Sequence, residues 1–171
     1  MFLLHFRKTT LHGKAISKRW DGADDTSEKV SRLSDTFKVS VGTVVPHRTP
    51  EIGQPHYFLD VASAPAHATI GDLRQRRYMG TLHRGPFVVL RRTSSPSDQR
   101  RIVASLYPGT DEIAVENHLI VLQPADEKLL SCVEIMKRLR APSIDAWINE
   151  RIRCRHLTTQ IIKLLPIGKS A

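Results

Sequence analysis

The chain has 171 residues, with 26 Lys plus Arg against 17 Asp plus Glu, 40% hydrophobic residues and two cysteines. This length allows one compact domain whose core needs neither disulfides nor metal. No stretch approaches the roughly 18 consecutive apolar residues of a membrane helix, which excludes a membrane span. Met1 to Phe6 lacks the flanks of a secretion signal, and Cys132 and Cys154 are isolated, so a reduced, cytoplasmic setting is expected.

The formal net charge of +9 is unevenly distributed along the chain. Residues 74–101 carry eight arginines and one acid, whereas residues 111–134 carry six acids and one lysine. A guanidinium group can bind a phosphate or a guanine edge through two parallel hydrogen bonds. The arginine cluster therefore suits a nucleic-acid-binding surface, although an arginine-rich solvated surface would have the same composition.

The first third of the chain is poor in regular patterns. Residues 1–30 show no apolar period and predict a flexible leader or the remnant of an upstream domain. Phe37 to Val45 alternates apolar and polar residues, which predicts a half-buried strand, and Gly42 within it marks a bulge or a close backbone approach. Pro46 to Ala66 is rich in proline and predicts a long loop.

Three segments rich in β-branched residues follow: Phe87 to Arg92, Arg101 to Tyr107 and Ala114 to Leu122. Turn-like segments separate them, which predicts a meander of strands. The ends of the first two carry the pairs Arg91–Arg92 and Arg100–Arg101. A meander would place these four guanidinium groups at one edge of the sheet, as a phosphate clamp.

After Pro124 the apolar period becomes helical. We expect one helix over Leu129 to Leu139, a second beginning at Ser143 as its N-cap, and a short third helix capped by Thr158. The elements predict an α/β (α+β) fold, with a mixed or antiparallel twisted sheet and a C-terminal layer of two to three helices. The domain is expected to span residues 31–167, followed by a tail at 168–171.

Motifs for catalysis are missing from the sequence. There is no G-x-G-x-x-G or P-loop for phosphate, no H-E-x-x-H or C-x-x-C for metal, and no G-x-S-x-G for a nucleophile. We therefore predict no catalytic residue and no metal site. His118, within an apolar segment, is interpreted as a structural histidine.

Several phrases of the sequence resemble those of a known family. Leu33 to Gly42 has the form Leu-x-Asp-x-Phe-x-Val-x-x-Gly, and a Leu-Pro-Ile phrase closes the chain. The other phrases are VGTVVPHR (41–48), RRTSS (91–95), VENHLIVL (115–122) and IRCRHLT (152–158). Together they resemble the C-terminal target-recognition domain of adenine-N6 DNA methyltransferases of restriction-modification systems, and half of a type I specificity subunit.

The resemblance implies a domain that docks on double-stranded DNA and selects the site. In that family a separate catalytic domain or subunit transfers a methyl group from S-adenosylmethionine. This chain has no Asn-Pro-Pro-Tyr type motif and no glycine-bearing cofactor loop. We therefore expect no enzyme activity and no cofactor in the chain alone, with S-adenosylmethionine bound only by a methyltransferase partner or missing domain.

Site residues are predicted on this basis, with arginines fixing register on the phosphates and loop residues reading bases. The predicted phosphate-binding residues are Arg74, Arg76, Arg77, Arg91, Arg92, Arg100 and Arg101. The base-reading candidates are Arg48, Gln54, His56 and Arg84. A structural or partner-facing role is predicted for Asn117, His118, Arg153, Arg155 and His156.

Three alternatives remain at this stage. An RNA- or ribosome-associated protein would share the charge, but only 6% of the residues are aromatic, which is a poor supply of stacking platforms. A nuclease could use Asp111, Glu112 and Glu116, but no lysine stands at nuclease-like spacing. A structural interaction partner could use the apolar helices, most of whose surface is expected in the core.

Overall fold

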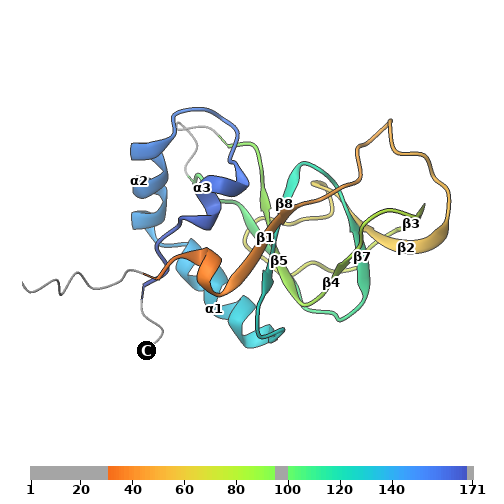
Figure 1. The fold of residues 1–171 in the computed structure, drawn as a ribbon, viewed down its shortest axis with the longest axis horizontal. Coiled ribbons are helices and arrows are strands. Elements are labelled where there is room, and N and C mark those ends of the chain that lie inside the picture. Colours follow the sequence, from red (N-terminus) through yellow and green to blue (C-terminus); the bar gives the residue numbers. More distant parts are fainter. Residues whose placement is uncertain (1–30, 95–99, 169–171) are drawn as a thin grey trace, which may run out of the picture.

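The computed structural model describes residues 31–94 and 100–168. They form two four-stranded sheets and three α-helices, with the helices at one end of the molecule and the smaller sheet at the other (Figure 1). The predicted α+β class is confirmed, although two sheets replace the single sheet expected. The predicted leader, residues 1–30, lies outside the described residues.

The large sheet has the strand order β1-β8-β5-β6 and is antiparallel throughout. Leu122 pairs with Val39 on one side and with Val88 on the other. The two central strands, β5 and β8, are buried on both faces, which explains why their sequences are nearly continuous runs of Val, Ile and Leu. The strands are β1 (Phe37–Val41), β5 (Phe87–Arg91), β6 (Ala104–Tyr107) and β8 (Leu119–Pro124).

The helices cover one face of the large sheet and enclose the main core (Figure 1). Helix α1 (Leu129–Leu139) has the predicted bounds and buries Cys132, Ile135, Met136 and Leu139. Helix α2 (Pro142–Arg151) begins earlier than expected, because Ala141 is its N-cap and Pro142 occupies the first turn, where its missing N–H costs nothing. Helix α3 (Thr159–Lys163) has the predicted cap, since the Thr158 hydroxyl accepts from the Ile161 amide at 3.3 Å.

The small sheet has the strand order β3-β2-β7-β4 and contains one parallel pair, β2 with β7. Its strands are β2 (Gln54–Leu59), β3 (Gln75–Tyr78), β4 (His83–Arg84) and β7 (Glu112–Val115). A second core, which includes Leu59, Phe87, Ile113 and Val121, fills the space between the two sheets. The small sheet therefore packs on the face of the large sheet that the helices leave uncovered.

Two strand predictions were wrong. The segment 114–122 is not one strand, because a turn at Glu116 to His118 sends β7 to the small sheet and β8 to the large one. The proline-rich segment 46–66 is not all loop, because β2 lies within it and pairs with β3 and β7. The predicted meander is thus limited to the β5–β6 hairpin.

Gly42 lies where β1 passes the β7–β8 turn. A Cβ at this position would overlap the backbone carbonyl oxygen of Glu116. The close backbone approach predicted from the sequence is therefore confirmed, and it fixes the end of β1 against the turn that joins the two sheets.

The first and last described segments meet at the helical end of the molecule. Arg32, ahead of the 3₁₀ turn η1 (Leu33–Asp35), forms a bridge with Pro166, and the Ile167 amide donates to the Ser31 carbonyl at 2.9 Å. Both segments therefore lie at the end away from the small sheet (Figure 1). Among the described helices, none has the length and apolar character needed to cross a bilayer.

Candidate nucleic-acid interface

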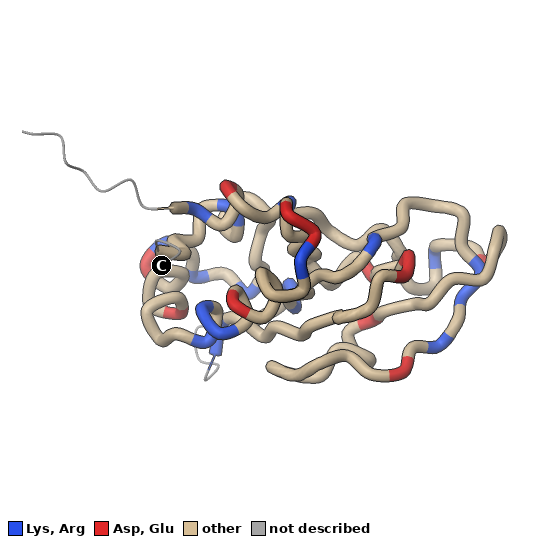
Figure 2. Tube along the Cα trace, turned by 90° about the horizontal axis from the view of Figure 1, so that it is seen from below, with Lys and Arg blue, Asp and Glu red and all other residues tan. Residues whose placement is uncertain are grey.

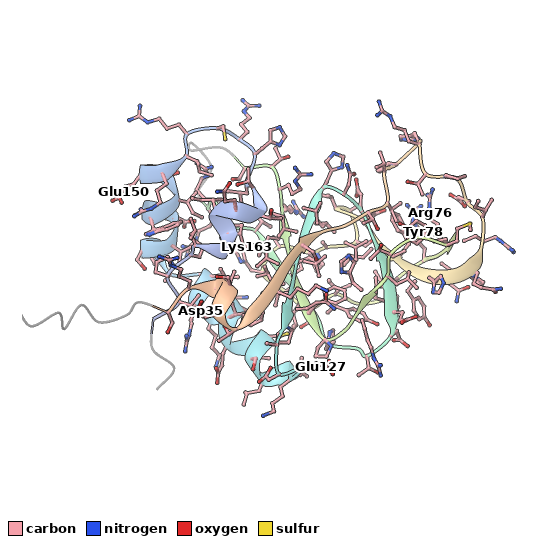
Figure 3. All side chains as sticks on the ribbon, viewed as in Figure 1. Asp35, Arg76, Tyr78, Glu127, Glu150 and Lys163 are labelled. Atoms are coloured by element: carbon pink, nitrogen blue, oxygen red, sulfur yellow. The ribbon has the colours of Figure 1, made fainter. Side chains whose placement is uncertain are left out.

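Arg76 and Arg77 lie in β3, the outermost strand of the small sheet, and Arg74 directly precedes it. Arg74 and Arg76 place their guanidinium groups 5.0 and 5.4 Å from the centre of the Phe58 ring. Each also has a carboxylate partner, Asp60 at 2.9 Å for Arg74 and Glu51 at 3.0 Å for Arg76. Figure 3 shows Arg76 beside Tyr78 at this end of the molecule.

These partners leave the β3 arginines unequally available to a ligand. The Arg74 side chain is 65% exposed, whereas that of Arg76 is 13% exposed and also donates to the Thr49 carbonyl at 2.6 Å. Arg77 lies on the opposite face of the strand from Arg76 and is exposed. It has no ion-pair partner among residues 31–94 and 100–168. Arg74, just before β3, and Arg77, within it, are thus the cations here that can reach a polyanion.

Asp60 remains ionised as the partner of Arg74. Burial raises the pKa of this carboxyl, but hydrogen bonds from Ser63 and the Arg74 guanidinium outweigh burial and hold the pKa below its ordinary value. A bound phosphate would therefore compete with a charged carboxylate for Arg74.

Arg91 and Arg92 lie at the end of β5 and are half-buried. Arg91 donates to the Ala64 carbonyl at 2.9 Å, and Arg92 donates to the Asn117 carbonyl at 2.9 Å. Both side chains therefore brace neighbouring loops. Because a carbonyl does not neutralise a guanidinium, each arginine still contributes positive charge to the surface beside it.

Arg101 corrects the sequence prediction. Its side chain is 1% exposed, and it donates to Ser94 Oγ at 3.1 Å, Asn149 Oδ1 at 2.8 Å and the Cys154 carbonyl at 2.9 Å. A buried guanidinium with these partners cannot contact a phosphate, so the predicted phosphate-binding role of Arg101 was wrong. Its burial follows from the start of β6 running beneath α2, where the Arg101 amide also donates to Asp145 at 2.9 Å.

The predicted clamp of four guanidinium groups is therefore not formed. Arg100 pairs with Asp145 at 3.0 Å, and its side chain is 35% exposed. Arg101 points inward, whereas Arg91 and Arg92 brace loops. Figure 2 shows basic positions at both ends of the molecule. Arg76 and Arg77 belong to the small sheet, whereas Arg100 and Arg101 bond to α2, so the arginines of residues 74–101 do not make one continuous cluster.

Three of the four base-reading candidates belong to strands of the small sheet. Gln54 and His56 lie in β2, opposite Tyr78 and Arg76, and Arg84 lies in β4, opposite Glu112. Arg48 alone lies in a turn, where it is exposed. The expectation that all four occupy irregular loops was wrong, because only Pro55 of this segment's prolines lies in β2, near its start and ahead of Tyr57, where pairing with β7 begins.

The small sheet nevertheless brings two of these candidates to one hollow. His56 and Arg84 line it together with Gln75 and Tyr57, and Asp111 and Glu112 close one side. The Tyr57 residue is 41% exposed. Guanidinium and amide donors beside carboxylate acceptors match the mixed hydrogen-bonding edges of base pairs better than a row of phosphates. Sequence reasoning missed Gln75 and Tyr57, because β3 gave no strand signal and β2 was predicted as loop.

The residues assigned a structural or partner-facing role lie on two connections, the β7–β8 turn between the sheets and the segment between α2 and α3. Asn117 and His118 form the β7–β8 turn, where His118 Nδ1 lies 2.7 Å from a carboxylate oxygen of Glu116. Arg153, Arg155 and His156 lie between α2 and α3 with exposed side chains. Figure 1 shows both connections on the same long edge of the molecule.

A metal centre is not supported by the described part of the chain. No group of three or more His, Cys, Asp or Glu side chains gathers there in a way that could hold an ion. Cys132 is buried and Cys154 is exposed, and both are free thiols. Burial raises the pKa of the Cys132 thiol to about 12, so this thiol is an unreactive part of the core.

No protein-family model and no curated protein sequence matches the chain. Solved structures do match. A chain from a structure on the complex assembly and conformational transition of the type I R-M system is similar over 78% of this chain, with a TM-score of 0.55 and 12% identity. The HsdS subunit from Thermoanaerobacter tengcongensis is similar over 78% of this chain, with a TM-score of 0.51 and 14% identity.

These comparisons identify the architecture. The chain has the fold of a type I specificity-subunit domain. At 12–14% identity the likeness concerns the fold alone. The chain spans about a third of the length of the matched chains, 32% of one and 30% of the other.

Proposed function

We propose that this specificity-subunit-like domain selects the DNA target of a restriction-modification system. The observation that carries the proposal is the fold, shared with type I specificity subunits over 78% of the chain. The specific system inferred from the sequence phrases is adenine-N6 methylation. In this proposal a methyltransferase partner or domain binds S-adenosylmethionine and transfers the methyl group, while this chain supplies no catalytic group.

The small sheet supports a recognition role. Its hollow offers donors from Arg84 and Gln75 and acceptors from Glu112, next to the exposed ring of Tyr57. These are the side-chain types that distinguish base pairs in the major groove. Arg77, exposed on the outermost strand, supplies a nearby cation for a phosphate, so positioning and selection fall to different residues of one sheet.

Binding of the full chain to random and selected duplexes tests this proposal. If about six phosphates are neutralised, the logarithm of the affinity falls with the logarithm of salt concentration with a slope near −5. Arg77→Ala should weaken binding to all duplexes equally, whereas Arg84→Ala should change the selected sequence. Lys128→Ala, which removes an exposed charge from the far side of the large sheet, is the control and should do neither.

Two results would contradict the proposal. The first is a salt slope near zero for duplex DNA. The second is a preference for single-stranded RNA over duplex DNA in direct competition, which would favour the RNA-associated alternative. Adding a type I methyltransferase subunit and S-adenosylmethionine tests the partner, because only the mixture should methylate adenine at the selected site.

A further inference from the structure

Four segments that are distant in sequence form one continuous edge of the molecule. The Ser94 amide donates to the Arg155 carbonyl and the Leu157 amide donates to the Arg92 carbonyl, both at 2.7 Å. The Arg92 amide donates to the His118 carbonyl at 2.9 Å, and the Asn117 amide donates to the Val44 carbonyl at 2.8 Å. These bonds join the α2–α3 connection, the end of β5, the β7–β8 turn and the β1–β2 connection.

Figure 1 shows the same arrangement. The α2–α3 connection, the β7–β8 turn and the β1–β2 connection lie in this order along the upper edge of the view, from the helical end toward the small sheet. We call this row the basic edge and define it as residues 44–48, 92–94, 117–118 and 153–156. In Figure 3, nitrogen-tipped side chains project outward along it.

The charge of the basic edge has one sign. Its exposed side chains include three arginines, Arg48, Arg153 and Arg155, and none of these has an ion-pair partner among residues 31–94 and 100–168. Half-buried Arg92 adds a further guanidinium. Exposed imidazoles of His47, His118 and His156 stand between the arginines.

The nearest acids do not offset these cations. Glu116 is 7% exposed, and its carboxylate accepts from the Val61 amide at 2.9 Å while its other oxygen faces His118. Glu51 pairs with Arg76, Asp60 with Arg74 and Glu150 with Arg151. These carboxylates are thus engaged with other groups, which leaves a row of cations facing solvent.

Buried Arg101 explains how the α2–α3 connection keeps its place. Its guanidinium donates to the Cys154 carbonyl and to Ser94 Oγ, and thereby ties the connection to the end of β5 from beneath. Because the backbone carbonyls are held inward, the side chains of Arg153, Arg155 and His156 are left outside.

We infer that the basic edge is the surface that follows the phosphate backbone of duplex DNA, and that Arg153 and Arg155 are its principal phosphate contacts. The inference rests on the proposed function and extends it. It moves the main phosphate contacts from residues 74–101 to residues for which the sequence predicted a structural or partner-facing role. Bases would then be read by the small sheet, at one end of the edge.

The test compares two double variants of the full chain that remove equal charge. R153A/R155A removes the two exposed guanidinium groups of the α2–α3 connection, and K128A/K137A removes the exposed ammonium groups of the α1 N-cap and of its last turn. Duplex affinity is measured by fluorescence anisotropy over a range of salt concentrations. R153A/R155A should reduce the steepness of the salt slope by about 2, equally for selected and unrelated duplexes, because each lost phosphate contact removes about 0.9 from the slope. K128A/K137A should leave the slope nearly unchanged.

The outcomes separate the inference from the function beneath it. Equal loss in both variants, or no loss in R153A/R155A while the wild-type chain binds duplex DNA, overturns the basic edge and leaves the proposed function intact. Absence of duplex binding by the wild-type chain, or tighter binding of single-stranded RNA, overturns both. Urea unfolding of both variants checks that the substitutions leave the fold unchanged, as expected for exposed side chains.

Discussion

The large sheet and the small sheet hold their shapes by different means. The large sheet is buried on both faces, by the helices on one side and by the second core on the other. The outer face of the small sheet has only a minor cluster of Val44, Phe58, Tyr78 and Ala114, with Arg74 and Arg76 stacked over the Phe58 ring. The large sheet is therefore the frame that stabilises the fold, whereas the small sheet buries fewer apolar side chains and exposes polar ones.

The same contrast explains why some arginines are buried and others are exposed. Arg101 lies just before β6 of the large sheet and is part of the buried frame, where carbonyl, amide and hydroxyl oxygens accept from its guanidinium. Arg77 lies on the outermost strand of the small sheet and remained exposed. Burial, rather than residue type, decides which arginines are available to a ligand.

The largest expected effect tests the frame against the small sheet. Leu122→Ala, at a fully buried position of β8, should lower the free energy of unfolding by about 4 kcal/mol, because it leaves a cavity enclosed by both neighbouring strands. Leu82→Ala, at a partly buried position beside the minor cluster, should cost only about 1 kcal/mol. Urea unfolding measures both changes. Equal losses of unfolding free energy would contradict the distinction between a stabilising large sheet and a less buried small sheet.

The next effect concerns Arg101. Arg101→Leu should lower the free energy of unfolding by about 3 kcal/mol, because Asn149 and the carbonyls of Ile152 and Cys154 lose their buried donor. Arg100→Leu is the matched control and should cost less than about 1 kcal/mol, since the Arg100–Asp145 pair is partly solvated. If the two variants were equally stable, Arg101 would not hold the α2–α3 connection in place.

The smallest effect is a dependence of stability on pH. Burial lowers the pKa of His83 in β4 and of His67 beside β6, and for His67 repulsion by Arg140 and Arg100 adds to it. As pH falls below the ordinary histidine pKa of 6.5, these histidines therefore bind protons more readily in the unfolded chain than in the folded chain. Stability should be fully present above that value and decline as pH falls toward the lowered values.

Urea midpoints at about pH 7 and about pH 5 measure this dependence. His83→Asn should remove the part of the pH dependence that comes from the small sheet, and His67→Asn the part that comes from beside the large sheet. A wild-type midpoint that rises on acidification would contradict the sign of both shifts.

Local pattern carried part of the structure. The apolar spacing of 129–139 and the hydroxyl of Thr158 predicted α1 and the cap of α3, because helix periodicity and capping depend on nearby residues. Strands β1, β5 and β6 were predicted from alternation and β-branched residues. Strand β3 was not, because an arginine-rich edge strand has no apolar face to signal it.

The site was harder to predict than the fold. The sequence singled out Arg84 and His56 together with the positive charge, and the structure places both residues at one hollow. It assigned Arg101 to phosphate binding, although this residue is buried. It assigned Arg153 and Arg155 a structural or partner-facing role, and both side chains are exposed. Whether an arginine faces solvent depends on what packs over it, and nothing in the neighbouring residues records that α2 covers the start of β6.

The sequence by itself determined the helical layer, the principal strands, the basic character and the resemblance to target-recognition domains. Only the tertiary structure decided how the strands divide between two sheets. It also decided that Arg101 is buried, and that residues 44–48, 92–94, 117–118 and 153–156 form one edge. The physical reason is range. Periodicity and caps are set by residues within a few positions, whereas sheet partition and surface charge are set by pairings between strands far apart in the chain.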